Sequence, residues 1–219
     1  MRLLLATALL DDVRWAASAG LLDGVYTTPA ALHAATSDPR EHVIALAHTA
    51  AVPIHVSVHA VLGGDVHRDA RELSGLADQV VVHLPLVEDA IGTMHRLRAE
   101  GVRMAADFVF TPAQALLAAR AGASAVVTPL AEAAAAGLVV TTMIRDIRRA
   151  LDAARAECDL IAGNPASPAE LAEVVAAGAD AVVAPASLLR AALLHPATDR
   201  SVDAFLNEVA RHPRAWGSG

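Results

Sequence analysis

Short apolar runs alternate with alanine-rich amphipathic segments about eight times along this chain of 219 residues. Strands that alternate with helices of about 10 to 15 residues indicate βαβ units and a parallel sheet. Eight such units favour closure, so we expect an α/β fold of the (β/α)8 TIM barrel type. The predicted strands cover residues 3–6, 24–27, 54–58, 80–84, 103–108, 125–127, 160–162 and 181–184.

The boundaries of several of these units repeat one design. The sequences "AARAGASAVVTP" (118–129) and "EVVAAGADAVVAP" (173–185) share it, and "SAGLLDGVYTTP" (18–29) is a looser relative. In each, we expect a glycine to end a helix in the left-handed conformation, an apolar strand to follow, and a proline to end the strand. The segments "TPAQ" (111–114) and "SPAE" (167–170) predict helix starts, because each combines a capping hydroxyl, a proline and a polar side chain three residues on.

The length of the chain fits one (β/α)8 barrel. We therefore predict a single domain over residues 1–219, which ends in a C-terminal helix and tail over about residues 201–219. The first apolar run is interrupted by Asp11 and Asp12, which is unlike a secretory signal. No apolar segment reaches the roughly 18 to 20 residues needed to span a bilayer, so we expect a soluble, cytoplasmic protein.

Charge and cysteine content limit the partners. The chain carries 17 basic and 24 acidic residues, a formal net charge of −7. It has no basic run that would release counterions from a nucleic acid or an anionic membrane, so we expect neither as a partner. Cys158 is the only cysteine, which excludes an intramolecular disulfide and a cysteine-based metal cluster. We predict a small-molecule substrate, with no cofactor and no resident metal.

Strand alternation sends several polar side chains into the predicted barrel. In "IHVSVH", the residues His55, Ser57 and His59 share one face, while the apolar residues between them must face the helices. The stretch "QVVVHLPLV" places His83 inward by the same rule, and Asp107 points inward near the end of the next strand. Barrel enzymes carry their chemistry at the C-terminal ends of the strands, so these side chains form the candidate site.

We predict that His83 and Asp107 form the catalytic pair. An unpaired buried carboxylate is costly, so Asp107 needs a partner, and a carboxylate beside an imidazole raises the basicity of the ring. Such a histidine can take a proton from carbon or oxygen and return it elsewhere. The residues predicted to bind the substrate are Ser57, His59, His55, Thr28 and Asn164. A buried histidine is often a satisfied core residue, and that interpretation stays open for His55 and His59.

Three segments carry a resemblance to a known family. "GVYTTPAAL", "VVVHLPLV" and "GVRMAADFVFTPAQALLAARAGASAVVTPL" are similar to the strand-two, strand-four and strand-five to strand-six regions of the small transaldolases and fructose-6-phosphate aldolases. The resemblance extends over essentially the whole chain. It implies a (β/α)8 barrel that forms a homo-oligomer, a pentamer or decamer assembled through C-terminal helices. Trp216 would then anchor the assembly, or it could cover its own barrel.

The resemblance also implies that the central chemistry has changed. The family uses a strand-four lysine that forms a Schiff base with the ketose, and His83 occupies that position here. All 17 residues of the Lys+Arg total are arginines, so the chain has no lysine. The phosphate-binding arginine of the family corresponds to Ala133, which implies an unphosphorylated and less polar substrate. The other departures from the family fall at Ala6, Thr28, Ser57, Asp107, Leu130 and Asn164.

Three functions stay open from the sequence. We favour a lysine-independent enzyme of the lyase, dehydratase, isomerase or cyclase type, in which His83 and Asp107 transfer protons on a small carbonyl metabolite of specialised biosynthesis. A metal-dependent aldolase or lyase could instead use His83, Asp107 and one of His55 or His59 as ligands. A non-catalytic relative of the aldolases could bind a ligand or a protein in the same cavity.

Overall fold

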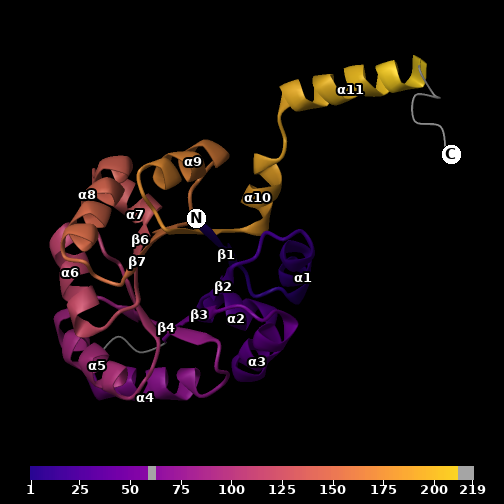
Figure 1. Cartoon of the computed structure of the whole chain (residues 1–219). Helices are drawn as coiled ribbons and strands as arrows, with labels where there is room; N and C mark the ends of the chain where they lie inside the picture. Colours follow the sequence, from indigo (N-terminus) through magenta and orange to yellow (C-terminus); the bar gives the residue numbers. More distant parts are fainter. Residues whose placement is uncertain (59–62, 212–219) are drawn as a thin grey trace.

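Eight parallel strands close into a barrel that is surrounded by helices (Figure 1). The computed structural model describes residues 1–58 and 63–211. Each strand pairs with its neighbours in chain order, and the last strand pairs with the first. The strands are β1 (Arg2–Ala6), β2 (Gly24–Thr27), β3 (Ile54–Ser57), β4 (Val80–Pro85), β5 (Met104–Asp107), β6 (Ala125–Pro129), β7 (Asp159–Gly163) and β8 (Ala181–Ala184).

Helices connect the strands and cover the outer face of the barrel (Figure 1). Among the described residues, two helices follow each of β2, β6 and β8, and one helix follows each of the other strands. The helices are α1 (Leu10–Ser18), α2 (Pro29–Ala35), α3 (Pro39–Thr49), α4 (Gly63–Ser74), α5 (Glu88–Ala99), α6 (Pro112–Ala121), α7 (Leu130–Ala135), α8 (Val140–Ala153), α9 (Pro168–Ala176), α10 (Ala186–Ala192) and α11 (Pro196–Arg211).

Alternation along the strands divides the apolar side chains into two layers. The larger core lies between the strands and the helices, and it includes Leu5, Ile54 and Leu84. A smaller cluster fills the barrel interior, and Leu4 and Val81 belong to it. Most members of the interior cluster are alanine or valine. Small interior side chains leave room for larger polar side chains from neighbouring strands.

The fold prediction is confirmed. All eight predicted strands are present; β2 and β8 have the predicted bounds, and the other six differ by at most two residues at an end. Gly122 and Gly178 have left-handed φ values of 113° and 112° where the repeated design expects them. A Cβ at Gly122 would also lie 2.5 Å from Cδ of Arg98, so packing requires glycine there as well. Thr111 and Gln114 form the predicted capping box at the start of α6.

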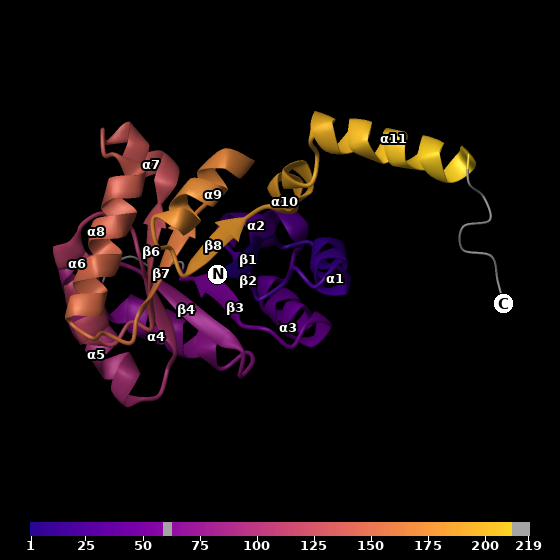
Figure 2. The ribbon, with the colours of Figure 1, turned by 45° about the horizontal axis from the view of Figure 1, so that its top comes forward.

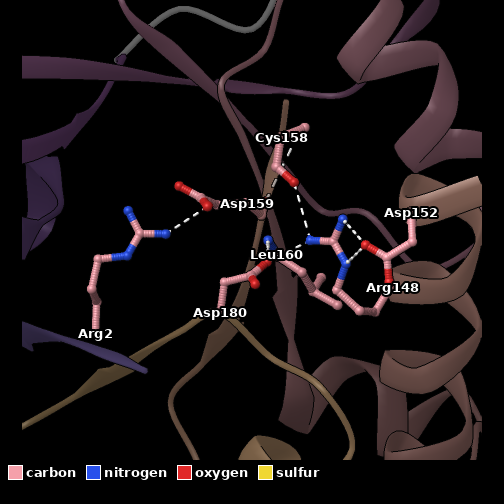
Figure 3. A network of polar contacts seen from close by, with 7 residues as sticks. All are labelled: Arg2, Arg148, Asp152, Cys158, Asp159, Leu160 and Asp180. Atoms are coloured by element: carbon pink, nitrogen blue, oxygen red, sulfur yellow. Dashed lines mark hydrogen bonds and ion pairs between the residues drawn. The ribbon is translucent and has the colours of Figure 1, made fainter. Parts of the chain in front are cut away.

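Ion pairs close the N-terminal end of the barrel, which we call the floor (Figure 3). Arg2 on β1 pairs with Asp159 on β7 at 2.5 Å. Arg148 on α8 pairs with Asp180 at 2.6 Å, and Asp180 also accepts a hydrogen bond from the backbone N–H of Leu160 at 2.7 Å. The floor therefore ties β1, β7, β8 and α8 together through charged side chains.

Cys158 lies beside this network (Figure 3). It is buried, and burial raises the pKa of its thiol to about 12. A thiol that stays protonated is a poor nucleophile, and Cys158 packs in the core as a small side chain.

The C-terminal helix leaves the barrel. Leu188 and Leu189 of α10 are buried, whereas α11 extends away from the barrel in Figure 2, and none of its side chains is buried. The helix begins at Pro196, before the predicted start near residue 201. Trp216 lies outside the described residues. Within residues 1–58 and 63–211, no helix is long and apolar enough to cross a membrane.

Candidate active site

Three polar side chains form a hydrogen-bonded column inside the barrel. His83 on β4 lies between His55 on β3 and Asp107 on β5. Its Nδ1 is 2.7 Å from Oδ1 of Asp107, and its Nε2 is 2.7 Å from Nδ1 of His55. We call this set the His55–His83–Asp107 column. The contact that the sequence predicted between His83 and Asp107 is therefore present, and His55 extends it.

Strand register orders the column along the barrel. His83 is level with Ser57, two residues beyond His55 on β3, and Asp107 is level with Pro85, two residues beyond His83 on β4. Asp107 is thus nearest the C-terminal ends of the strands, which we call the mouth. The side chain of Asp107 keeps 9% of its surface exposed, whereas that of His83 keeps none. A molecule that enters from the mouth therefore meets Asp107 before either ring.

One arrangement of protons satisfies the column when Asp107 is ionised. A carboxylate only accepts hydrogen bonds, so a neutral His83 donates from Nδ1 and accepts at Nε2. His55 must then donate from Nδ1. Burial, and next the proximity of His83, lower the pKa of His55 to about 2, so this ring is neutral near pH 7. His55 therefore fixes the tautomer in which His83 points its proton at Asp107.

Tyr26 is a site residue that the sequence analysis missed. Its ring meets the ring of His83 edge-on, with centroids 5.1 Å apart and an interplanar angle of 84°. Burial, and next the charge on Asp107, raise the pKa of Tyr26 to about 12, although its hydrogen bond with Ser57 opposes this shift. The hydroxyl stays protonated and can donate. The alternation of side chains along β2 could have identified Tyr26, because it shares the inward face with Gly24.

Ser57 and His55 are the predicted substrate-binding residues that lie with the column. Ser57 is half-buried, and its hydroxyl is 3.5 Å from Oδ2 of Asp107. His55 is the deepest member of the column, behind His83 as seen from the mouth. The structure thus brings Ser57 to the carboxylate and places His55 beneath the residues that a bound molecule would meet.

Among the described residues, neither Thr28 nor Asn164, which were also predicted to bind the substrate, forms a hydrogen bond with the column. The hydroxyl of Thr28 accepts a hydrogen bond from the backbone N–H of Ala31 at 3.2 Å, so it caps α2. Asn164 is exposed directly after β7, where it adopts a left-handed φ of 56°. His59 lies outside the described residues.

The column does not converge on a common point, as metal ligands would. Both ring nitrogens of His83 are engaged, one with Asp107 and one with His55. Among the residues that the structure describes, no three His, Cys, Asp or Glu side chains are arranged to hold a metal ion. The ligand set that the sequence allowed from His83, Asp107 and His55 is therefore not assembled here.

Two departures from the family lie directly after β6. Leu130 and Ala133 are both buried in the core between the barrel and the helices, and α7 begins at Leu130. Ala6 does pack against the interior cluster. Glu132 is exposed on α7, and its charge contributes to the raised pKa of Tyr26.

The arrangement is suited to proton transfer at Asp107. Oδ1 of Asp107 is held by His83, whereas Oδ2 makes a long contact of 3.5 Å with Ser57. A carboxylate oriented in this way can accept a proton from a bound carbon acid. The neutral hydroxyls of Ser57 and Tyr26 can donate hydrogen bonds to an oxygen that gains negative charge.

Residues 41–217 match the family described as Transaldolase/Fructose-6-phosphate aldolase. The chain belongs to this family. A probable transaldolase of Hydrogenobaculum sp. is 31% identical over 217 residues, which cover 97% of this chain and 98% of the relative. A probable transaldolase of Desulfosudis oleivorans is 29% identical over 211 residues, which cover 95% and 97%. The barrel is thus that of an enzyme family, matched over nearly the full length of these relatives.

Solved structures share the fold at lower identity. FabK from Thermotoga maritima superposes with a TM-score of 0.56 at 17% identity, over 84% of this chain and 57% of that one. A cube-shaped protein cage designed by fusing symmetric oligomeric domains gives a TM-score of 0.62 at 13% identity, over 97% and 77%. At these identities the likeness concerns the fold alone.

Proposed function

We propose that this protein is a lysine-independent enzyme of the transaldolase family, which uses Asp107 and His83 to transfer protons on a small, unphosphorylated carbonyl compound. The observation that carries the proposal is the 2.7 Å hydrogen bond between Nδ1 of His83 and Oδ1 of Asp107 in the barrel interior. His83 stands where the resemblance places the Schiff-base lysine, and the chain contains no lysine. Without an iminium as electron sink, the reactions favoured are isomerisation, dehydration and cyclisation.

The order of the column assigns the roles. Asp107, nearest the mouth, removes a proton from the carbon beside the substrate carbonyl. The electron pair of that C–H bond moves to the carbonyl oxygen, which accepts hydrogen bonds from Ser57 and Tyr26. His83 holds the carboxylate in position and acts through it. With an α-hydroxyl group on the substrate, Asp107 returns the proton to the former carbonyl carbon while the hydroxyl proton moves to the enolate oxygen, which gives an isomer. With a β-hydroxyl group, the enolate re-forms the carbonyl as that group leaves with the proton of Asp107 as water, which gives a dehydrated product.

The proposal is tested by proton exchange, which does not require the natural substrate. Hydroxyacetone in D₂O is incubated with the full chain, and the loss of its α-proton signals is followed by ¹H NMR. We expect enzyme-dependent exchange that Asp107→Asn reduces by about 10²- to 10⁴-fold, which is the usual contribution of a positioned acid or base. His83→Gln reduces it less, because this residue acts through Asp107.

A matched control separates the carboxylate from general negative charge. Glu132→Gln removes an exposed acid that influences Tyr26 without contacting the column, and it should leave the exchange rate within about twofold of wild type. A folded Asp107→Asn variant that exchanges at the wild-type rate would refute the proposal.

We also propose that the protein assembles with copies of itself through α11. Val202, Phe205, Leu206 and Val209 recur at spacings of three and four residues, which places them on one face of the helix, and they are 44% to 62% exposed. Such a stripe on a helix with no buried side chain requires a covering surface. The family resemblance points to a pentamer or decamer.

Sedimentation velocity at about 50 μM protein tests the assembly. We expect an oligomer that the double substitution Phe205→Glu and Leu206→Glu converts to monomer. Arg200→Glu, which lies on the same helix outside the apolar stripe, is the control and should leave the oligomer intact. A wild-type monomer at this concentration contradicts the proposal.

A further inference from the structure

We infer that the mouth of the barrel recognises an uncharged carbonyl compound that carries an aromatic or similarly apolar group, and that Phe108 binds this group. The inference rests on the proposed function, because it concerns the molecule on which Asp107 acts. Three residues at the C-terminal ends of strands carry it, namely Leu9, Val87 and Phe108. Each of them departs from a local rule of protein structure, and each departure exposes an apolar side chain.

Phe108 combines two unfavourable features directly after Asp107. Its φ is 63°, a left-handed value that a bulky residue adopts at a cost. Its side chain is also 50% exposed. Simple alternation would send Phe108 under the helices, where Phe110 packs against the core. A strained backbone that holds an aromatic ring in water beside a buried carboxylate points to a ring that is kept for a ligand.

Leu9 and Val87 are also exposed apolar residues, and both stand at the starts of helices. Leu9 is the N-cap of α1 and Val87 is the N-cap of α5, and neither side chain makes a capping hydrogen bond. They are 57% and 42% exposed. Serine, threonine, aspartate or asparagine at these positions would stabilise the helices. Other helices of this barrel use such caps, namely Thr28, Asp38, Thr111 and Ser167.

These apolar residues border the mouth on two sides. The backbone N–H of Leu86 donates to the carbonyl of Asp107 at 3.0 Å, so the segment that carries Val87 lies against the end of β5, where Phe108 follows. Leu9 follows β1, which stands opposite β5 in the closed ring of strands. Exposed apolar residues thus follow β1, β4 and β5 at the end of the barrel where Asp107 lies.

The charges near the mouth select against anions. Asp107 and Glu132 each raise the pKa of Tyr26, so both place negative charge within reach of this site residue. Arg2 belongs to the floor, and Arg103 precedes β5 at that same end. A carboxylate or phosphate on the substrate would meet repulsion from Asp107 and Glu132. An uncharged carbonyl compound with an apolar group fits both the charge and the exposed side chains.

The test measures binding of three related probes to the full-length protein by isothermal titration calorimetry. The probes are 4-phenylbutan-2-one, butan-2-one, which lacks the ring, and 4-phenyl-2-oxobutanoate, which carries a carboxylate. We expect the phenyl ketone to bind at least about tenfold more tightly than butan-2-one, as removal of a large apolar contact predicts. We expect the anionic analogue to bind more weakly than the phenyl ketone.

Phe108→Asn is the decisive variant, because asparagine tolerates the left-handed conformation and the fold is retained. It should reduce the preference for the phenyl ketone over butan-2-one by at least about fivefold, without lowering the melting temperature. Phe108→Tyr should keep the preference. Val139→Ser is the matched control: Val139 is an exposed apolar N-cap too, but it starts α8 beyond the far end of α7, so its replacement should leave the preference unchanged.

The outcomes separate this inference from the proposed function. An equal preference in wild type and Phe108→Asn overturns the inference, even when hydroxyacetone exchange proceeds. Tighter binding of the anionic analogue also overturns it. A preference that depends on Phe108 but survives in a protein with no hydroxyacetone exchange supports the binding site while refuting the proposed proton transfer.

Discussion

The floor and the mouth of this barrel treat carboxylates in opposite ways. At the floor, Asp159 and Asp180 are each paired with an arginine (Figure 3). At the mouth, Asp107 is held by the ring of His83, whose other nitrogen contacts His55. The floor thus neutralises its carboxylates with permanent cations, whereas the mouth leaves Asp107 beside a histidine ring, which can exchange protons. In (β/α)8 barrels the bottom face serves stability and the top face serves chemistry.

Asp107→Asn is the most direct test of the difference between the floor and the mouth. This change should lower the proton-exchange rate by about 10²- to 10⁴-fold without lowering the free energy of unfolding. The amide oxygen of asparagine still accepts the proton of His83 Nδ1, and a buried charge disappears. Urea unfolding measured beside the exchange assay checks both parts. A large loss of stability would mean that the mouth serves the fold as the floor does.

Acid should weaken the mouth through His55. The pKa of this ring is about 2 in the folded protein and near 6.5 when the chain is unfolded. Between these values the unfolded chain binds a proton that the folded chain does not. The free energy of unfolding therefore falls as the pH falls below about 6.5, by up to about 1.4 kcal/mol per pH unit.

Urea unfolding at pH 7 and pH 5 measures this dependence, which amounts to about 2 kcal/mol over that interval. His55→Leu should flatten it. His95→Gln, an exposed histidine on α5, is the control and should leave it unchanged. An unaltered pH dependence in the His55→Leu variant would show that this ring is not the source.

At the floor, Asp180→Ala should cost stability but not activity. The change leaves a guanidinium N–H of Arg148 and the backbone N–H of Leu160 without their acceptor. We expect a loss of about 2 kcal/mol in the free energy of unfolding, because the site is only partly exposed. Asp152→Ala, which removes an exposed partner of the same arginine, should cost less than about 0.5 kcal/mol. A reduced exchange rate in the folded Asp180→Ala protein would contradict the division between floor and mouth.

The smallest effects concern the helix starts at the mouth. Thr111→Val removes the capping box of α6 and should lower the free energy of unfolding by about 1 kcal/mol. Val87→Ser should raise it by roughly 0.5 kcal/mol or more, because α5 gains a cap that it lacks. Thermal unfolding of both variants checks the signs. A gain in stability for Val87→Ser beside a loss for Thr111→Val would show that the protein keeps Val87 at a cost in stability. A loss for both variants would contradict this.

Much of the fold could be predicted because each strand carries its own signal. Valine-rich runs between glycine and proline marked the strands, and a closed ring of parallel strands places consecutive strands side by side. The contact of His83 with Asp107 follows from that neighbourhood. The contact of His83 with His55 does not, because it depends on the register that sets Ser57 level with His83.

Other parts of the site could not be predicted for local reasons. Thr28 was expected at the substrate, but its hydroxyl satisfies a backbone N–H at the start of α2. Leu130 entered the core because α7 begins directly after β6. The alternation rule places Tyr26 inward, since it is two residues from the inward Gly24, but the threonines that follow it are the more obvious polar residues at this strand end.

The assembly proposed through α11 would make the folding of this helix depend on protein concentration. A helix of 16 residues without tertiary packing is marginal in water, because propensity alone barely exceeds the cost of nucleation. Its helicity should therefore fade on dilution well before the barrel loses its own circular dichroism signal. A biphasic dilution curve would report, without any label, when another chain ceases to cover Phe205 and its neighbours.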